Sequence, residues 1–171
     1  MVEIPSIWRT ELLHPLVVHF PIALLLTATF FELLSYLLIK FPVGKNCKII
    51  ALPLFVIGVI FGWLSIWTGD QAHSVVNKVI CDPTITETHE YWAKLAIWLF
   101  SFVAINKVFI QLISLRFRLP HSIFKGLAIL GGLVCVGGVI ILTYAAHVGV
   151  SLVYQQGAGV YHPTAECSEF E

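Results

Sequence analysis

Long apolar runs separated by short polar segments dominate the chain. Four stretches carry few charged side chains, at about 15–39, 49–68, 91–115 and 123–152. A helix rises about 1.5 Å per residue, so about 20 apolar residues cross the hydrocarbon core of a bilayer. The pattern predicts an all-α fold, an integral membrane four-helix bundle with up-down-up-down order in one domain, followed by a tail over 153–171.

Composition supports a membrane protein. Of the 171 residues, 58% are hydrophobic and 12% are charged, and the mean hydropathy is +0.88. Ten basic and ten acidic side chains balance, with no basic stripe, which argues against nucleic-acid binding and for the lipid bilayer as the main surrounding. The segment before the first apolar run lacks the basic start and cleavage site of a signal peptide, so we expect the first helix to be retained.

Basic residues predict the orientation in the membrane. They gather between the first and second helices and between the third and fourth, at Lys40, Lys45, Lys48, Arg116, Arg118 and Lys125. Positively charged short loops stay in the cytoplasm. We therefore expect a multi-pass protein of the cell inner membrane with both termini on the extracytoplasmic side.

Four cysteines fall on different sides of this arrangement. Cys81, in the central loop, and Cys167, in the tail, are both expected on the oxidising side, where disulfides persist. We predict that these two pair. Cys47 and Cys135 are expected to be unpaired.

Histidines gather toward the outward ends of the predicted helices. Six of the seven lie there, at positions 14, 19, 73, 89, 147 and 162. His19 and His89 are 70 residues apart (89 minus 19), and His73 and His147 are 74 apart (147 minus 73). The spacing suggests two related hairpins whose four imidazoles converge in the outer half of the bundle.

The histidines differ in their expected burial. His19 and His147 are expected to be the most buried, whereas His73 and His89 lie nearer the interface, where a ring can be a ligand or stay hydrated. His14 is kept as a further cofactor-binding candidate, although it and His162 are expected near the surface or behind the ligands. Asp70 precedes His73 by three residues and either orients that ring or belongs to a polar cluster at the helix end.

Imidazoles on separate helices favour haem b as the cofactor. No thiolate-rich spacing for structural zinc occurs, Met1 is the only methionine for a copper thioether site, and no C-x-x-C-H motif for covalent haem is present. Haem b needs one or two imidazoles and an apolar pocket. With two haems we expect His19 to pair with His89 and His73 with His147; with one, His19 and His147 are the first candidates, then His89.

A second polar pair lies in the opposite half of the predicted bundle. Glu32 and Lys107 should both sit about 12–14 Å from the cytoplasmic ends of their helices. We predict a buried ion pair between them. Its role is either structural or that of a route for protons or a contact for a quinone.

The motifs HPLVVHFPIALLL, TGDQAH and AHVGVSLVYQQGAGV resemble those of a family of uncharacterised bacterial four-helix membrane proteins, described as a domain of unknown function. The resemblance covers about 14–160. It points to His14, His19, His73 and His147, with a turn at Gly157 and Gly159 after them. Members can occur fused to or beside Rieske-type iron–sulphur and cytochrome proteins, which implies a respiratory setting.

These observations lead to three hypotheses about function. The first is a b-type cytochrome subunit that passes electrons between quinol and a periplasmic cytochrome or iron–sulphur protein, beside other membrane redox subunits, and that is not an enzyme on its own. The second is a cofactor-free scaffold or accessory subunit of a larger respiratory complex. The third is a non-haem metal site.

Overall fold

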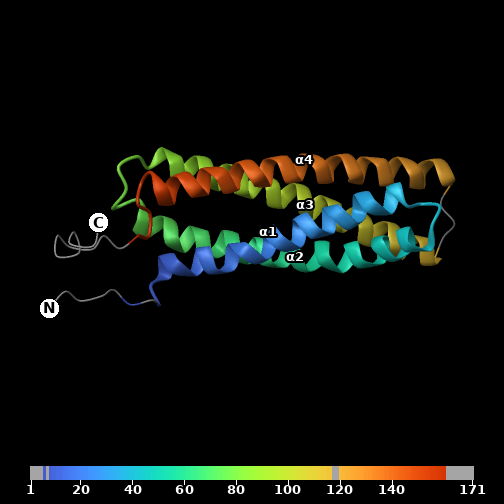
Figure 1. The fold of residues 1–171 in the computed structure, drawn as a ribbon, viewed down its shortest axis with the longest axis horizontal. Helices are drawn as coiled ribbons and strands as arrows, with labels where there is room; N and C mark the ends of the chain where they lie inside the picture. Colours follow the sequence, from blue (N-terminus) through green and yellow to red (C-terminus); the bar gives the residue numbers. More distant parts are fainter. Residues whose placement is uncertain (1–5, 7, 117–119, 161–171) are drawn as a thin grey trace.

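Four long helices make up almost all of the described chain. The computed structural model describes residues 6, 8–116 and 120–160, and the helices are α1 (Thr10–Leu37), α2 (Pro42–Val76), α3 (Thr84–Arg116) and α4 (His121–Tyr154) (Figure 1). The described residues form no strand, so the predicted all-α four-helix fold is confirmed. Each helix is long and apolar enough to cross a membrane, and the chain is a multi-pass membrane protein.

Most helix ends lie beyond the apolar runs that predict them, although α1 ends at Leu37, two residues before the end of its run. Whereas the apolar run covers 49–68, α2 begins at Pro42, whose fixed φ suits a first helical turn, and continues to Val76. At 35 residues this helix is about 52 Å long, more than the roughly 30 Å hydrocarbon core requires. His73, expected after the end of the second helix, therefore lies inside it.

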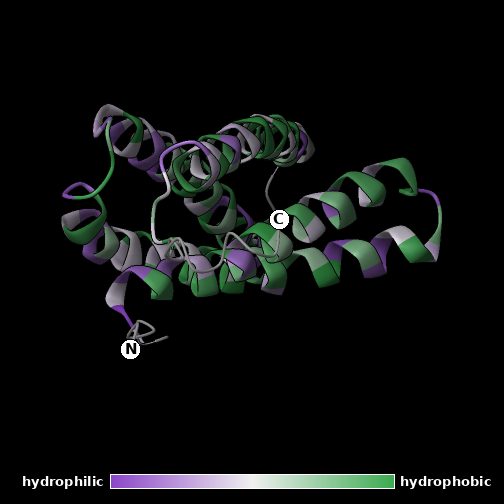
Figure 2. Ribbon diagram, turned by 60° about the vertical axis from the view of Figure 1, so that its left-hand side comes forward, coloured by the Kyte–Doolittle hydropathy of each residue, from purple (hydrophilic) through white to green (hydrophobic). Residues whose placement is uncertain are grey.

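The four helices are arranged as two hairpins. Along most of their length α1 packs on α2 and α3 packs on α4, and the hairpins meet where α2 contacts α3 and α1 contacts α4. Two views show the hairpins lying beside one another (Figures 1 and 2). Helices α1 and α3 are thus diagonal. We call the end where α1 begins and α4 ends the proximal end, and the opposite end the distal end.

The two hairpins repeat one another. Between residues 131 and 152, the buried positions of α4 are Gly131, Cys135, Gly138, Leu142, Ala145, Val148 and Leu152. Each lies 80 residues after a buried position of α2, namely Ala51, Phe55, Gly58, Gly62, Ser65, Thr68 and Ala72, as in 145 minus 65. Over this stretch the two helices bury the same face turn for turn.

Helices α1 and α3 show the same relation with a separation of 75. The buried residues Pro21, Leu25, Ala28 and Thr29 of α1 match the buried residues Ala96, Phe100, Val103 and Ala104 of α3, as in 100 minus 25. The prediction of two related hairpins is confirmed, but its separations of 70 and 74 are wrong. The second hairpin is longer because α3 has 33 residues where α1 has 28.

The interior between the hairpins is apolar through its middle. Leu25, Phe55, Phe100 and Val103 are fully buried there, and the Phe55 and Phe100 rings stack with centroids 6.2 Å apart. The outside of the bundle is also largely hydrophobic, as expected for lipid contact (Figure 2). Polar side chains that enter this apolar interior are therefore the candidates for function.

Candidate histidine site

His14 and His89 meet inside the proximal half of the bundle. Their ring centroids are 6.0 Å apart and the ring planes are inclined by 84°. The two residues come from the diagonal helices α1 and α3, and they are separated by 75 residues (89 minus 14), the separation that relates these helices throughout. The two imidazoles are therefore equivalent members of the repeat.

Each ring is held by a backbone carbonyl of the next helix. His14 Nδ1 lies 3.0 Å from the Ser65 carbonyl oxygen of α2, and His89 Nδ1 lies 2.9 Å from the Ala145 carbonyl oxygen of α4. A carbonyl oxygen only accepts, so each Nδ1 carries the hydrogen and donates it. In a neutral imidazole Nε2 then keeps its lone pair, which is the arrangement of a metal-binding histidine.

Two glycines leave room for the rings. A Cβ atom added at Gly69 would lie 3.2 Å from Cε1 of His14, and one added at Gly149 would lie 2.9 Å from Cε1 of His89. Each glycine follows the carbonyl acceptor of its ring by four residues, or about one helical turn. The repeat thus conserves the whole arrangement of ring, acceptor and glycine between the two hairpins.

A small apolar cavity lies beside the two rings. All four helices line it, and its volume is about 50 Å³. Besides the histidines its walls include Val18, Pro21, Gly62, Ala93 and Leu142. Apart from Ser65, the other side chains on its walls are apolar, so the imidazoles are the strongest candidate ligands there.

His19 and His147, expected to be the most buried candidates, are exposed. His19 turns back along its own helix, where Nδ1 donates to the carbonyl oxygen of Pro15. In the repeat, His19 matches Lys94 (94 minus 75) and His147 matches Trp67 (147 minus 80), so neither is equivalent to another histidine. Position along a helix does not fix the face on which a residue lies, and this is why the burial prediction is wrong.

His73 belongs to a polar chain that joins α2 to α3 at the proximal end. Its Nδ1 donates to Glu90 Oε2 over 3.0 Å, and its Nε2 accepts a hydrogen from Asn77 Nδ2. Asn77 Oδ1 in turn accepts from the Thr86 hydroxyl at 2.6 Å. Both ring nitrogens of His73 are engaged, so this ring does not offer a free lone pair as His14 and His89 do.

Of the two roles expected for Asp70, the orientation of His73 is not the one found. Its Oδ1 lies 3.6 Å from Lys94 Nζ, and Lys94 also contacts Glu90 Oε1. Glu90 is closer to the imidazole because α3 brings it directly opposite His73. The carboxylate beside His73 therefore comes from the other hairpin, and Asp70 belongs to the polar cluster that was the alternative.

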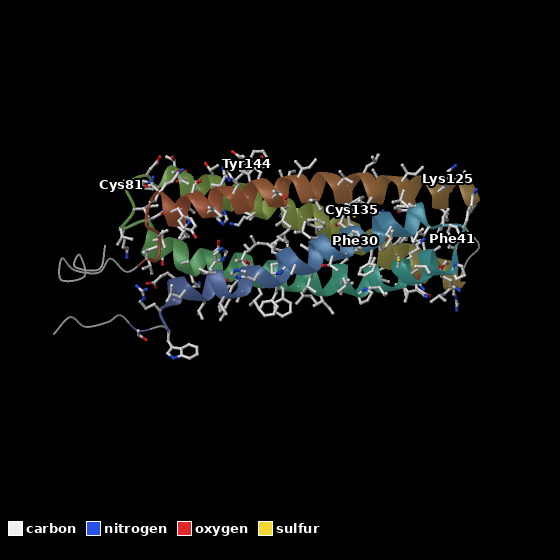
Figure 3. All side chains as sticks on the ribbon, in the orientation of Figure 1. Phe30, Phe41, Cys81, Lys125, Cys135 and Tyr144 are labelled. Carbon is white, nitrogen blue, oxygen red and sulfur yellow. The ribbon has the colours of Figure 1, made fainter. Side chains whose placement is uncertain are left out.

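Two sequence predictions fall on parts of the tail that are not described. Cys81 is exposed at the proximal end (Figure 3), but Cys167 lies outside the described residues, so their disulfide stays a prediction. His162 also lies outside them. Cys47 and Cys135 are buried and form no disulfide within the described residues. Gly157 and Gly159 both have positive φ, 68° and 70°, which confirms a turn there.

The predicted ion pair between Glu32 and Lys107 is confirmed. Lys107 Nζ lies 2.5 Å from Glu32 Oε2, and the two side chains are 12% and 1% exposed. Tyr36 adds a contact, because its hydroxyl donates to Glu32 Oε1 at 2.7 Å. The pair lies in the distal half of the interior.

The candidate site contains residues that the sequence predictions missed. These are the carbonyls of Ser65 and Ala145, together with Gly69 and Gly149. A comparison of the halves at separations of 75 and 80 would have aligned His14 with His89 and Gly69 with Gly149. The signal is weak because the residues around these matches differ.

Comparisons with models of protein families, with curated proteins and with solved structures give no match to this chain.

Proposed function

We propose that the chain is a membrane b-type cytochrome that holds one haem b between His14 and His89. In this proposal it passes electrons between a quinol and a periplasmic cytochrome or iron–sulphur protein, as a subunit beside other membrane redox proteins. The observation that carries the proposal is the pair of equivalent imidazoles, 6.0 Å apart, each with Nδ1 held by a backbone carbonyl.

The number of protein ligands favours haem over a bare metal ion. Within residues 6, 8–116 and 120–160, no group of three or more His, Cys, Asp or Glu side chains is placed to hold a metal. Zinc and non-haem iron sites take at least three protein ligands. Haem b takes only one or two imidazoles, because the porphyrin supplies the remaining nitrogens.

The size of the site sets a requirement on binding. The cavity of about 50 Å³ is far smaller than a porphyrin. To admit one, the two hairpins have to move apart along the seam between them, where α2 contacts α3 and α1 contacts α4. The seam is where this is easiest, because each hairpin packs more extensively within itself than against the other. The donor set therefore fits haem, and the packing requires an opening of the seam.

The residues of the site have separate tasks in this proposal. The Ser65 and Ala145 carbonyls fix the ring orientation and the tautomer of the two histidines. The apolar walls keep water away and lower the local dielectric constant. Haem iron held by two imidazoles supplies a one-electron couple whose potential depends on these surroundings.

Orientation follows from the charges at the distal end. Lys40, Lys45, Lys48, Arg116 and Lys125 lie at or near that end, where Figure 3 labels Lys125. Short basic loops remain in the cytoplasm, so we propose that the proximal end and the histidine pair face the periplasm. This places the site within reach of a periplasmic partner.

The test is an optical spectrum of the detergent-solubilised protein, oxidised and then reduced with dithionite, with a pyridine haemochrome assay to count haem per chain. We expect one haem b per chain in the parent protein and its loss from His14→Ala and His89→Ala. His19→Ala and His147→Ala are the matched controls, since both histidines are exposed, and they should retain the haem.

Other results point elsewhere. A colourless protein from haem-replete cells would overturn the cytochrome proposal. Metal analysis of that protein would then separate a non-haem centre from a scaffold without a cofactor. Two haems per chain would contradict the single site between His14 and His89.

A further inference from the structure

Glu32 and Lys107 occupy equivalent positions of the two hairpins. They are 75 residues apart (107 minus 32), the separation that also relates His14 to His89. Each follows the histidine of its own helix by 18 residues, or five turns and about 27 Å, so the two lie on the same face as the histidines. The repeat therefore places a negative and a positive side chain at one and the same structural position.

The pair lies in an environment where charge matters. Glu32 is 1% exposed and Lys107 is 12% exposed, and the Lys107 Nζ lies over the Phe55 ring at 5.6 Å from its centroid. The Tyr36 hydroxyl contacts Glu32 and also lies 2.9 Å from the Ala128 carbonyl oxygen. Water does not screen charges in such a place, so two like charges there would repel strongly.

The apolar part of the seam uses the same positions in both hairpins, although the side chains differ at several of them, as Phe55 and Cys135 or Gly62 and Leu142 do. The two hairpins bury the same positions, with glycine at both Gly58 and Gly138 and small residues at Ala51 and Gly131. Because both hairpins bury the same face, the α1–α2 hairpin of a second chain is the competitor that the seam has to reject. If two α1–α2 hairpins met, Glu32 would face a second Glu32, and if two α3–α4 hairpins met, Lys107 would face a second Lys107.

We propose that the Glu32–Lys107 pair makes the seam selective, so that the α1–α2 hairpin accepts an α3–α4 hairpin and rejects a copy of itself. The partner that this surface recognises is the complementary hairpin, normally that of the same chain. Buried ion pairs add little net stability, and their best-attested use is to specify which elements pair. This inference is independent of any cofactor.

The test uses full-length chains with reversed charges. Glu32→Lys gives a chain with lysine at both equivalent positions, and Lys107→Glu gives a chain with glutamate at both. Produced alone, each variant should yield less than a tenth of the parent's monomer on size-exclusion chromatography. Produced together under two different tags, they should co-purify at least tenfold more than two tagged parent chains, because exchange of hairpins restores Glu–Lys pairs in both halves.

Two further variants separate selection from simple stabilisation. The double reversal Glu32→Lys/Lys107→Glu should return to monomer in parental yield. The neutral Glu32→Gln/Lys107→Met variant should also stay monomeric, because it has no like charges to separate.

Three results would overturn the proposal: monomers in parental yield from the single reversals, no co-purification above the parent pair, or a neutral variant that fails as badly as the single reversals. The last result would mean that the pair acts as a stabiliser only.

Discussion

Gly149 and His89 lie so close that the glycine cannot be exchanged for another residue without moving the ring. A Cβ atom at position 149 would be 2.9 Å from Cε1 of His89, and its counterpart at Gly69 would be 3.2 Å from Cε1 of His14. The helices α2 and α4 thus present a bare stretch of backbone to each imidazole. Glycine costs a helix about 0.5–1 kcal/mol relative to alanine, so room for the ring is obtained at the expense of helix stability.

We predict that Gly149→Ala displaces the His89 ring from the Ala145 carbonyl and destabilises the bundle by about 1–3 kcal/mol, as overpacking does. Gly69→Ala should have a smaller effect, because its added atom lies further from its ring. The thermal unfolding midpoint in detergent measures both. In the cytochrome proposal, haem content falls in the same order.

Gly137→Ala is the control for these variants. An added Cβ at Gly137 has no atom within 4 Å, so alanine should be neutral or stabilise α4 by about 0.5–1 kcal/mol. Equal losses at positions 137 and 149 would show that helix propensity, and not contact with the imidazole, decides the outcome.

The sequence predicts correctly the features that depend on composition averaged over about 20 residues. Apolar runs of about 20 residues give the four helices and the membrane, because composition over that length leaves little alternative. The Glu32–Lys107 pair also follows, since two opposite charges at the same depth in an apolar interior have few other partners. These predictions do not depend on the rotation of any helix.

The identity of the meeting histidines does depend on rotation. One residue along a helix turns a side chain by about 100°, so His14 faces the interior while His19, five positions later, is exposed. The expected depth of each residue in the membrane, taken alone, favoured His19 over His14. The partner of His73 was missed for a related reason, because Glu90 comes from another helix whose register no local pattern gives.

His73→Ala tests whether the polar chain at the proximal end is structural. The side chains of His73 and Glu90 are 31% and 33% exposed, and a hydrogen bond with that much contact with water contributes about 0.5–1.5 kcal/mol. We therefore expect only a small fall in the unfolding midpoint and, in the cytochrome proposal, an unchanged haem content. A loss of haem as large as that in His14→Ala would show that His73 is a ligand.

Asp82 should make the start of α3 sensitive to acid. Its Oδ1 accepts hydrogens from the Thr84 hydroxyl at 2.7 Å and from the Thr84 backbone nitrogen at 3.0 Å. These bonds favour the charged carboxylate and lower the pKa of Asp82 below its ordinary value of 3.8. A lowered pKa means that the folded state binds the proton less tightly than the unfolded chain does.

The contribution of Asp82 to stability is therefore complete above its ordinary pKa and is lost as the pH falls through the lowered one. The unfolding midpoints of the parent and of Asp82→Ala should differ near neutral pH and converge in strong acid. The carboxyl carbon of Asp82, followed by NMR in detergent micelles, gives the pKa directly. A midpoint difference that grows as the pH falls would have the wrong sign for this explanation.

Tyr36→Phe removes one hydroxyl from the distal polar cluster and leaves the ring in place. The hydroxyl donates to Glu32 Oε1 at 2.7 Å, and the acceptor is a charged, buried group, so its loss should cost about 1.5–3 kcal/mol. Tyr144→Phe is the matched control, because Tyr144 is 47% exposed and packs its ring edge-on against Trp92 at 5.2 Å. We expect a clear fall in the unfolding midpoint for Tyr36→Phe and almost none for Tyr144→Phe.

If Glu32→Gln is made first, the effect of Tyr36→Phe on the unfolding midpoint should shrink, because a neutral acceptor gains less from the hydrogen bond. An unchanged effect in that background would place the importance of the hydroxyl in its contact with the Ala128 carbonyl instead.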